Sequence, residues 1–329
     1  MKTRLLTRTD IKGFLTMATC MDAVESAFRD LASGEAVMPQ RTPIALPDKH
    51  GVALFMPAHI RSLGAIGAKV VTVYPDNVSK FGMPVIFGTI ILLDENSGFP
   101  IAVLEGGFLT AMRTGAVSGV ATKYMARKDA TVATVFGTGV QAFTQVLAVH
   151  EARPLERLFA YSIDPPDRKT AFADSVSEKI GIPVETVDDP ADAVRLSDIV
   201  VLATSAKDPI VDGRWFEPGT HINGIGSHAP KMRELDTLTV QKSRIICDLV
   251  DACKAEAGDF IIPADLGEWS WDKVAGSLGD VILGKVKGRT NDKEITLFKS
   301  VGLAIQDMSV AKAVYDEAVK AGIGTEFEF

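Results

Sequence analysis

The spacing of apolar and polar residues changes character near residue 130. From there on, "ATVATVF" and "RLFAYSI" have the pattern of short strands, whereas "FTQVLAVHEA" and "PPDRKTAFADSVSEKIG" have helical spacing, the second ending at Gly181. The alternation continues through "PVETV", "PADAVRLS", "DIVVLATS", "GTHINGIG" and "SRIICDLV". Strands and helices that alternate in this way predict an α/β fold with a Rossmann-like, doubly wound parallel sheet.

The residues before this region follow another pattern. A helix is predicted from Thr19 to Leu31, stopping near Gly34, and β-rich runs interrupted by Pro, Gly and "NSG" come after it. These runs, "TPIALP", "GVALFMPAHI", "LGAIGAKVVTVYP" and "PVIFGTIILLDENSGFPIAVLEG", predict an antiparallel or mixed sheet. A long helix, "FLTAMRTGAVSGVATKYMA", leads into the α/β region, and we expect the last helix, "VGLAIQDMSVAKAVYDEAVKAG", to pack back on the first domain.

Two domains follow from these patterns. We expect residues 1–114 with 302–329 to form an α+β substrate-binding and dimerisation domain, and residues 115–301 to form an NAD-binding, Rossmann-like domain. The β-runs of the first domain are so apolar that one helix would leave an apolar face of their sheet uncovered, which favours a homodimer.

Composition narrows the class of protein. The chain is 47% apolar and 23% charged, with a formal net charge of −7 and no like-charged block, as in a soluble globular protein, so nucleic acid is not an expected partner. The longest apolar runs are too short to span a bilayer, and the first residues lack the pattern of an export signal. Cys20, Cys247 and Cys253 have spacings that suit neither zinc nor a disulfide framework, so we expect packing thiols in a reducing cytoplasm.

The stretch "FGTGVQA" predicts a dinucleotide-binding turn. Gly137, Gly139 and Ala142 fit G-x-G-x-x-A, in which the first glycine permits the turn, the second lets the backbone approach a pyrophosphate, and the alanine allows close helix packing. The helix that follows presents its N-terminus to the phosphates. Because ordinary strand-helix turns also match this motif, the flanking strand and helix carry much of the prediction.

Asp164 ends the second strand of this region. An acid at this place would bind the ribose hydroxyls of NAD, although Asp164 could instead form a turn ahead of Pro165 and Pro166. Ser162 occupies the place where an acid is sometimes found, and Arg168 is near enough to bind a 2′-phosphate. We therefore expect NAD, with NADP not excluded.

Three cations of the first domain lie near glycines or prolines: Arg41 in "MPQRTP", Lys69 in "IGAKVV" and Arg113 in "LTAMRTGA". Most lone cations are solvated surface charges. Lys69 is the most informative, because it lies in an apolar β-run where a charge is costly unless an anion meets it.

With these residues noted, the chain resembles the ornithine cyclodeaminase/mu-crystallin family. The ordered motifs "AKVVTVYPDN", "LTAMRTGA", "FGTGVQA", "INGIGSHAP", "EAGD" and "EITLFKSVGLAIQD" carry the resemblance across nearly the whole chain. It implies an NAD(P)-dependent protein acting on an α-amino or α-imino acid. It also implies a homodimer formed through the N-terminal sheet, and an active site between the two domains.

The resemblance also implies residue roles. Arg41, Lys69 and Arg113 would bind the substrate carboxylate, and Val301 would touch the substrate. Holding the carboxylate fixes the α-carbon at hydride distance from the nicotinamide. The residues implied to line the cofactor are Val140, Gln141, Thr204, Ile225, Gly226, Ser227, His228 and Ser300.

Two departures from the family pattern bear on the substrate. Ornithine-specific members have an Asp where this chain has His228, and a Glu where it has "ALF" ahead of Met56 and Pro57. Because both acids suited to a basic side chain are missing, ornithine cyclodeamination is not expected.

The leading hypothesis is an imine reductase, or amino-acid dehydrogenase, with Lys69 and His228 as catalytic residues. Its substrate would carry a second negative charge, and iminosuccinate reduced to L-aspartate is the first case, with His228 as proton donor or anion contact. His228 could instead only cap a loop near Pro230. The alternatives are an alanine dehydrogenase-like enzyme, a cyclic ketimine reductase and, from another class, a ligand-binding protein like mu-crystallin.

Overall fold

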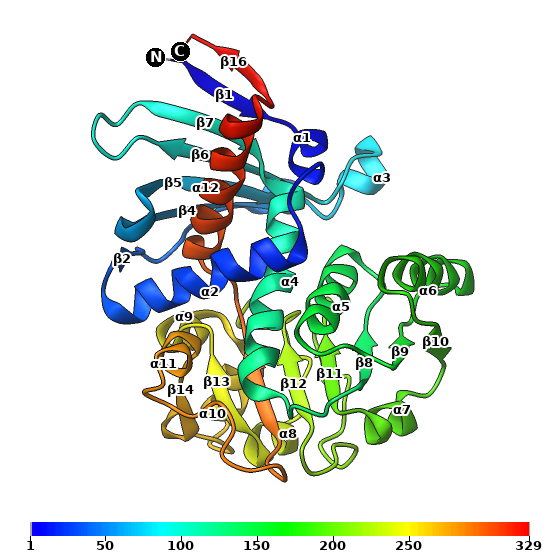
Figure 1. The fold of residues 1–329 in the computed structure, drawn as a ribbon. Helices are drawn as coiled ribbons and strands as arrows, with labels where there is room; N and C mark the ends of the chain where they lie inside the picture. Colours follow the sequence, from blue (N-terminus) through cyan, green and yellow to red (C-terminus); the bar gives the residue numbers. More distant parts are fainter. Residues whose placement is uncertain (1, 329) are drawn as a thin grey trace. The chain divides into compact units, whose positions relative to one another are not determined.

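The computed structural model describes residues 2–328, which form two compact units. Unit 1 contains the residues up to Arg113 together with those from Leu303 onward, and unit 2 is the continuous segment Thr114–Gly302. The first boundary falls inside helix α4, Gly106–Met125 (Figure 1).

Unit 1 is built from both ends of the described chain. Its strands are β1 (Thr3–Leu6), β2 (Ala36–Val37), β3 (Thr42–Leu46), β4 (Gly51–Ile60), β5 (Ala65–Val73), β6 (Ile86–Leu93), β7 (Pro100–Glu105) and β16 (Thr325–Phe327). Its helices, besides the start of α4, are α1 (Arg8–Lys12), α2 (Met17–Ser33), α3 (Asn77–Phe81), α12 (Ala304–Ala321) and the 3₁₀ turns η1 (Pro47–Lys49) and η2 (Arg61–Leu63).

The sheet of unit 1 is mixed, as predicted. Its order is β16-β1-β7-β6-β5-β4-β2, with β3 also paired to β4; β1 and β7 are parallel, and the other neighbours are antiparallel. Helix α2 ends at Gly34, which adopts the left-handed conformation with φ 84°. Helix α12 packs on α2, β4, β5 and β6, so the expectation that the last helix returns to the first domain is confirmed (Figure 1).

The two faces of this sheet differ in exposure. Lys69 lies opposite Met56 on β4 and Ile90 on β6, and all three side chains are buried on the face that α12 covers. Successive residues of a strand point to opposite faces. Phe55 and Ile91 therefore lie on the other face, where their exposed fractions are 40% and 39%.

Unit 2 contains a second sheet and the helices around it. Its strands are β8 (Val132–Phe136), β9 (Arg157–Tyr161), β10 (Val184–Val187), β11 (Ile199–Leu202), β12 (His221–Gly224), β13 (Arg244–Cys247), β14 (Val274–Ser277) and β15 (Thr296–Lys299). Its helices, besides the rest of α4, are α5 (Val140–Ala152), α6 (Pro166–Ile180), α7 (Pro190–Leu196), α8 (Thr237–Lys242), α9 (Val250–Glu256), α10 (Gly258–Asp265), α11 (Leu278–Ile282) and the 3₁₀ turn η3 (Trp271–Lys273).

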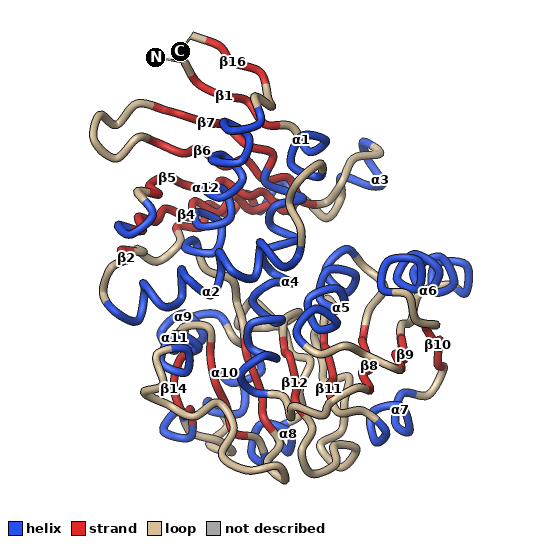
Figure 2. Tube along the Cα trace, in the orientation of Figure 1, coloured by secondary structure: helices blue, strands red, loops and turns tan. Residues whose placement is uncertain are grey.

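Every pairing in this second sheet is parallel, in the order β10-β9-β8-β11-β12-β15-β13-β14. Its strands, red in Figure 2, are connected by helices and loops. The predicted α/β fold class is confirmed. The chain runs outward from β8 to β10 and then returns to place β11 on the other side of β8. This reversal is a topological switch point, where open α/β sheets bind ligands at the carboxyl ends of their strands.

Strand β15 was not predicted from the apolar pattern. It lies between β12 and β13, and its polar end residues Thr296 and Lys299 are fully buried. Lys299 can be buried because its Nζ donates to Asp259 Oδ2 at 2.7 Å.

The three cysteines are buried and unpaired, as expected of packing thiols. Within residues 2–328, no helix combines the length and apolar character that crossing a membrane requires. The same residues contain no group of His, Cys, Asp or Glu side chains arranged to hold a metal ion.

Candidate functional site

The glycine turn after β8 has the geometry that a dinucleotide requires. Gly137 has φ 104°, and a Cβ on it would lie 2.7 Å from the carbonyl oxygen of Ala203, so the position excludes a side chain. Gly139 is the N-cap of α5, and a Cβ there would meet no atom within 4 Å among the described residues. The backbone at Gly139 is therefore open to an approaching pyrophosphate, and the first N–H groups of α5 have no acceptor within the helix.

Asp164 lies beside this turn. Its carboxylate accepts hydrogen bonds from Thr138 Oγ1, within the G-x-G motif, and from Ser162 Oγ at 2.8 Å. These two bonds, that from Thr138 first, lower the pKa of Asp164. Arg168 Nη1 lies 3.2 Å from Asp164 Oδ1, so this guanidinium already has an anionic partner. An ionised acid at this place suits ribose hydroxyls and repels a 2′-phosphate.

A buried glutamate, Glu234, connects the turns that follow β11 and β12. Its Oε1 accepts from Thr204 N and Thr204 Oγ1, both at 2.7 Å. Its Oε2 accepts from Gly226 N at 2.8 Å and Ser227 N at 3.2 Å. Three of the predicted cofactor residues thus share one carboxylate. Sequence reasoning missed Glu234, for which the available signal was an acid in the loop that follows a parallel strand.

His228 is exposed at the end of the same loop. Its Nδ1 donates to the carbonyl oxygen of Gly226 at 2.7 Å, which fixes the ring against the loop. This bond agrees with the loop-capping interpretation and leaves the proton-donor and anion-contact roles as proposals. Arg233, in the same loop, donates to Leu235 O at 2.8 Å and to Thr237 Oγ1 at 2.7 Å.

A second buried acid, Asp248, holds the other predicted residues at this edge. Its Oδ2 accepts from Ser300 Oγ and Val301 N, both at 2.8 Å, and from Gly302 N at 3.0 Å. Asp248 directly follows β13 and Ser300 directly follows β15, so both lie at the carboxyl ends of the strands.

Most of the predicted cofactor residues therefore come together along one edge of the unit 2 sheet. Ile225 is buried directly after β12, whereas Val140, at the start of α5, has an exposed fraction of 65%. Gln141 Oε1 is buried and has no hydrogen-bond partner among residues 2–328.

The three predicted carboxylate ligands belong to unit 1, where a buried acid joins two of them. Asp307 Oδ1 on α12 accepts from Lys69 Nζ at 2.7 Å and from Arg113 Nε at 2.9 Å. Arg113 Nη1 also donates to Gln306 Oε1 at 2.6 Å. Asp307 Oδ2 is buried without a hydrogen-bond partner in the described part of the chain. Sequence reasoning missed Asp307, although a charge inside the apolar spacing of the last helix was a signal for it.

The charges around Lys69 set its protonation. Burial and, next, the charge of Arg113 lower its pKa to about 7, with a smaller contribution in the same direction from Arg41, while Asp307 opposes the shift. The two buried cations Lys69 and Arg113, with the anion that they share, make this cluster suited to bind a carboxylate, and Lys69 is able to gain or lose a proton near neutral pH.

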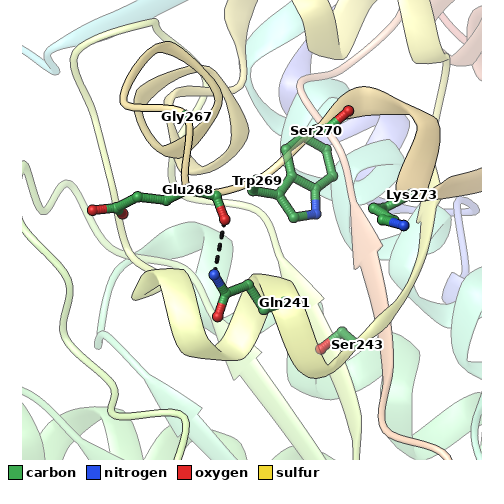
Figure 3. Close-up of a pocket in the computed structure, with 7 residues that line it drawn as sticks. All are labelled: Gln241, Ser243, Gly267, Glu268, Trp269, Ser270 and Lys273. Carbon is green, nitrogen blue, oxygen red and sulfur yellow. Dashed lines mark hydrogen bonds between the residues drawn. The ribbon is translucent and has the colours of Figure 1, made fainter.

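A hollow of about 430 Å³ lies elsewhere in unit 2 (Figure 3). Ser243 directly precedes β13 and Lys273 directly precedes β14, so the hollow is at the amino ends of the strands, away from the switch-point edge. The Gln241 amide donates to the Glu268 carbonyl oxygen across it at 2.8 Å. It contains none of the predicted site residues; its lining residues are Gln241, Ser243, Gly267, Glu268, Trp269, Ser270 and Lys273.

Comparison with known proteins places this geometry in a family. The structure of Thermococcus litoralis Δ¹-pyrroline-2-carboxylate reductase, in complex with NADH and L-proline, is 43% identical, with a TM-score of 0.95 over 98% of this chain and 99% of that one. An archaeal alanine dehydrogenase dimer with bound NAD is 36% identical, with a TM-score of 0.94 over 100% of both chains. The iminosuccinate reductase of Paracoccus denitrificans, in complex with NAD⁺, is 27% identical, with a TM-score of 0.92 over 100% of both chains.

The family model for ornithine cyclodeaminase/mu-crystallin matches residues 1–322. The match covers both units, including the Lys69 cluster of unit 1 and the Gly137 turn of unit 2. This chain therefore belongs to the ornithine cyclodeaminase/mu-crystallin family.

Proposed function

We propose that this chain is an NAD(H)-dependent oxidoreductase that reduces the C=N bond of an α-imino acid to the corresponding α-amino acid. The observation that carries the proposal is the buried Lys69–Asp307–Arg113 cluster. It offers paired cations for a carboxylate and an ammonium whose pKa, about 7, suits proton transfer. The relatives support the reaction class, because their names include two imine reductases and an amino-acid dehydrogenase.

The chain's own residues would divide the work between them. Arg41 and Arg113 hold the substrate carboxylate, which orients the imine carbon. Lys69 Nζ donates a proton to the imine nitrogen as the carbon is reduced, and Asp307 keeps this ammonium in place. The nicotinamide, when bound, supplies the hydride.

The cofactor would be NAD(H), held along the switch-point edge of unit 2. Gly137 and Gly139 leave space for the pyrophosphate, and Asp164 would accept hydrogen bonds from the ribose hydroxyls. Because Asp164 has a lowered pKa, its negative charge is present at neutral pH and disfavours the 2′-phosphate of NADP.

For the substrate, we propose a cyclic imine, Δ¹-pyrroline-2-carboxylate, as the first candidate, because the 43% identical relative carries this activity in its name. Iminosuccinate is the second candidate. His228 stands where the family places an acid for basic substrates, and an imidazole N–H suits a second carboxylate. The relative named for iminosuccinate is more distant, at 27% identity.

A substrate panel tests the proposal directly. Purified protein should oxidise NADH with Δ¹-pyrroline-2-carboxylate at a higher kcat/KM than with iminosuccinate or with pyruvate plus ammonia. NADPH should give a kcat/KM at least about tenfold lower, a difference of ~1.4 kcal/mol. Faster turnover of iminosuccinate would favour the dicarboxylic candidate. If no imino acid is turned over and another ligand binds tightly, the result would contradict the proposed enzyme and favour a ligand-binding protein.

We further propose a homodimer formed by the face of the unit 1 sheet that α12 leaves open. Light scattering at micromolar concentration should give twice the 35.2 kDa mass of one chain. Phe87→Glu places a charge on that face, at a side chain with an exposed fraction of 46%, and should yield monomers. Phe81→Glu is the matched control, since Phe81 is 66% exposed on α3, outside the sheet. A monomeric wild-type protein would refute this assembly.

A further inference from the structure

Glu234 has a chemical environment that packing alone does not require. Its side chain is fully buried, and its two oxygens divide four donors between two separate turns. Oε1 accepts hydrogen bonds from Thr204, in the turn that follows β11. Oε2 accepts them from Gly226 and Ser227, in the turn that follows β12. A carboxylate without hydrogens is the group that can accept at both oxygens in this way.

The glutamate is itself held rigidly. Asp259 Oδ1 accepts from the backbone N–H of Glu234 at 2.7 Å and from that of Leu235 at 2.9 Å. Asp259 Oδ2 in turn accepts from Lys299 Nζ at 2.7 Å. This buried ion pair connects β15 to the backbone of Glu234, so the backbone that carries the Glu234 carboxylate is held in place.

The two turns are also in close contact. A Cβ on Gly226 would lie 2.1 Å from the carbonyl oxygen of Thr204 and 2.4 Å from Glu234 Oε1. The turns after β11 and β12 therefore adopt one arrangement, in which the carboxylate bridges them. The other half of the predicted cofactor site, Gly137 and Asp164, follows β8 and β9. Gly137 lies against the carbonyl oxygen of Ala203, next to Thr204, but among the described residues neither Gly137 nor Asp164 is hydrogen-bonded to the Glu234 carboxylate.

We infer that Glu234 is a positioning residue for the nicotinamide half of the dinucleotide: its carboxylate holds the turns at Thr204 and at Gly226–Ser227 in the arrangement that receives this half. The inference rests on the proposed function. In a dinucleotide site of this topology, the half of the sheet on one side of the switch point binds the adenosine part, and the half on the other side binds the nicotinamide part. The carboxylate does not touch the reacting atoms.

The test separates the two halves of the ligand. Glu234→Gln keeps the shape but replaces one acceptor by an NH₂ group, which must then face two donors, so one turn loses its anchor. NADH affinity, measured by fluorescence titration, should fall about tenfold or more. Affinity for ADP-ribose, which lacks the nicotinamide, should stay within about twofold when measured by calorimetry.

Asp198→Asn is the matched control. Asp198 Oδ2 also anchors two backbone donors, Thr131 N at 2.9 Å and Val132 N at 3.0 Å, but it lies at the amino ends of β8 and β11. The Asp198→Asn substitution should leave the ratio of the NADH and ADP-ribose affinities unchanged. If Glu234→Gln does not fold, Glu234→Asp replaces it, because the shorter carboxylate keeps its charge but reaches one turn at most, and the same selective loss is expected.

The outcomes are distinct. Equal losses for NADH and ADP-ribose, or no loss for either, would overturn the role of Glu234. A wild-type protein that binds neither ligand would instead refute the proposed function.

Discussion

Replacing Lys69 by methionine is expected to lower kcat/KM for imine reduction by about 10³-fold, within the range for loss of a general acid. The variant removes the ammonium but keeps an unbranched side chain in the buried position on β5. The NADH-oxidation assay gives the rate, and NADH binding should be unchanged because the cofactor residues lie in unit 2. Lys80→Met is the control, since Lys80 is an exposed partner of Asp76. Loss of less than about tenfold would remove Lys69 from the chemistry.

The pH profile adds a second signature for Lys69. Its pKa in the folded protein is about 7, below the ordinary lysine value of 10.5, so the proton is present below pH 7 and lost above it. Because reduction consumes this proton, kcat/KM for the imine should fall as pH rises through about 7, and amino-acid oxidation should rise over the same range. This fall in kcat/KM near pH 7 should be missing from the residual activity of Lys69→Met.

Asp307→Asn should destabilise the protein by about 3–5 kcal/mol, the usual cost of leaving buried charges without their partner. The substitution removes the anion that two buried cations, Lys69 and Arg113, share. Urea unfolding at constant pH measures the change in the free energy of unfolding. Asp316→Asn is the control on the same helix, because its pair with Lys312 is partly exposed and should contribute about 0–1 kcal/mol. Equal losses in the two variants would contradict the role assigned to Asp307.

Local patterns were enough to predict the elements that have them. The turn at Gly137 was found because a strand and a helix flank it, and Lys69 was singled out because a charge in an apolar run needs an anion. The anion itself was not found. Asp307 lies 238 residues further along the chain, and nothing near either residue indicates that the two meet.

The same limit applies to the missed parts of unit 2. Strand β15 depends on Lys299 being neutralised by Asp259, 40 residues away, and Glu234 meets Thr204 across 30 residues. Buried polar networks follow the tertiary arrangement, whereas periodicity reports only which face of an element is apolar. The homodimer and the roles of individual site residues remain predictions.

Unit 1 is made from two segments that are far apart in the chain, and this affects its folding during synthesis on the ribosome. Unit 2 is one continuous segment and is able to fold as soon as it has emerged, but unit 1 needs α12 and β16, the partner of β1, and these are made last. Until residue 307 is available, Lys69 and Arg113 have no counter-charge, and the face of the sheet that α12 covers is open to the solvent. The nascent chain therefore carries an unfinished, aggregation-prone sheet for most of its translation, and chaperone demand should concentrate on that interval.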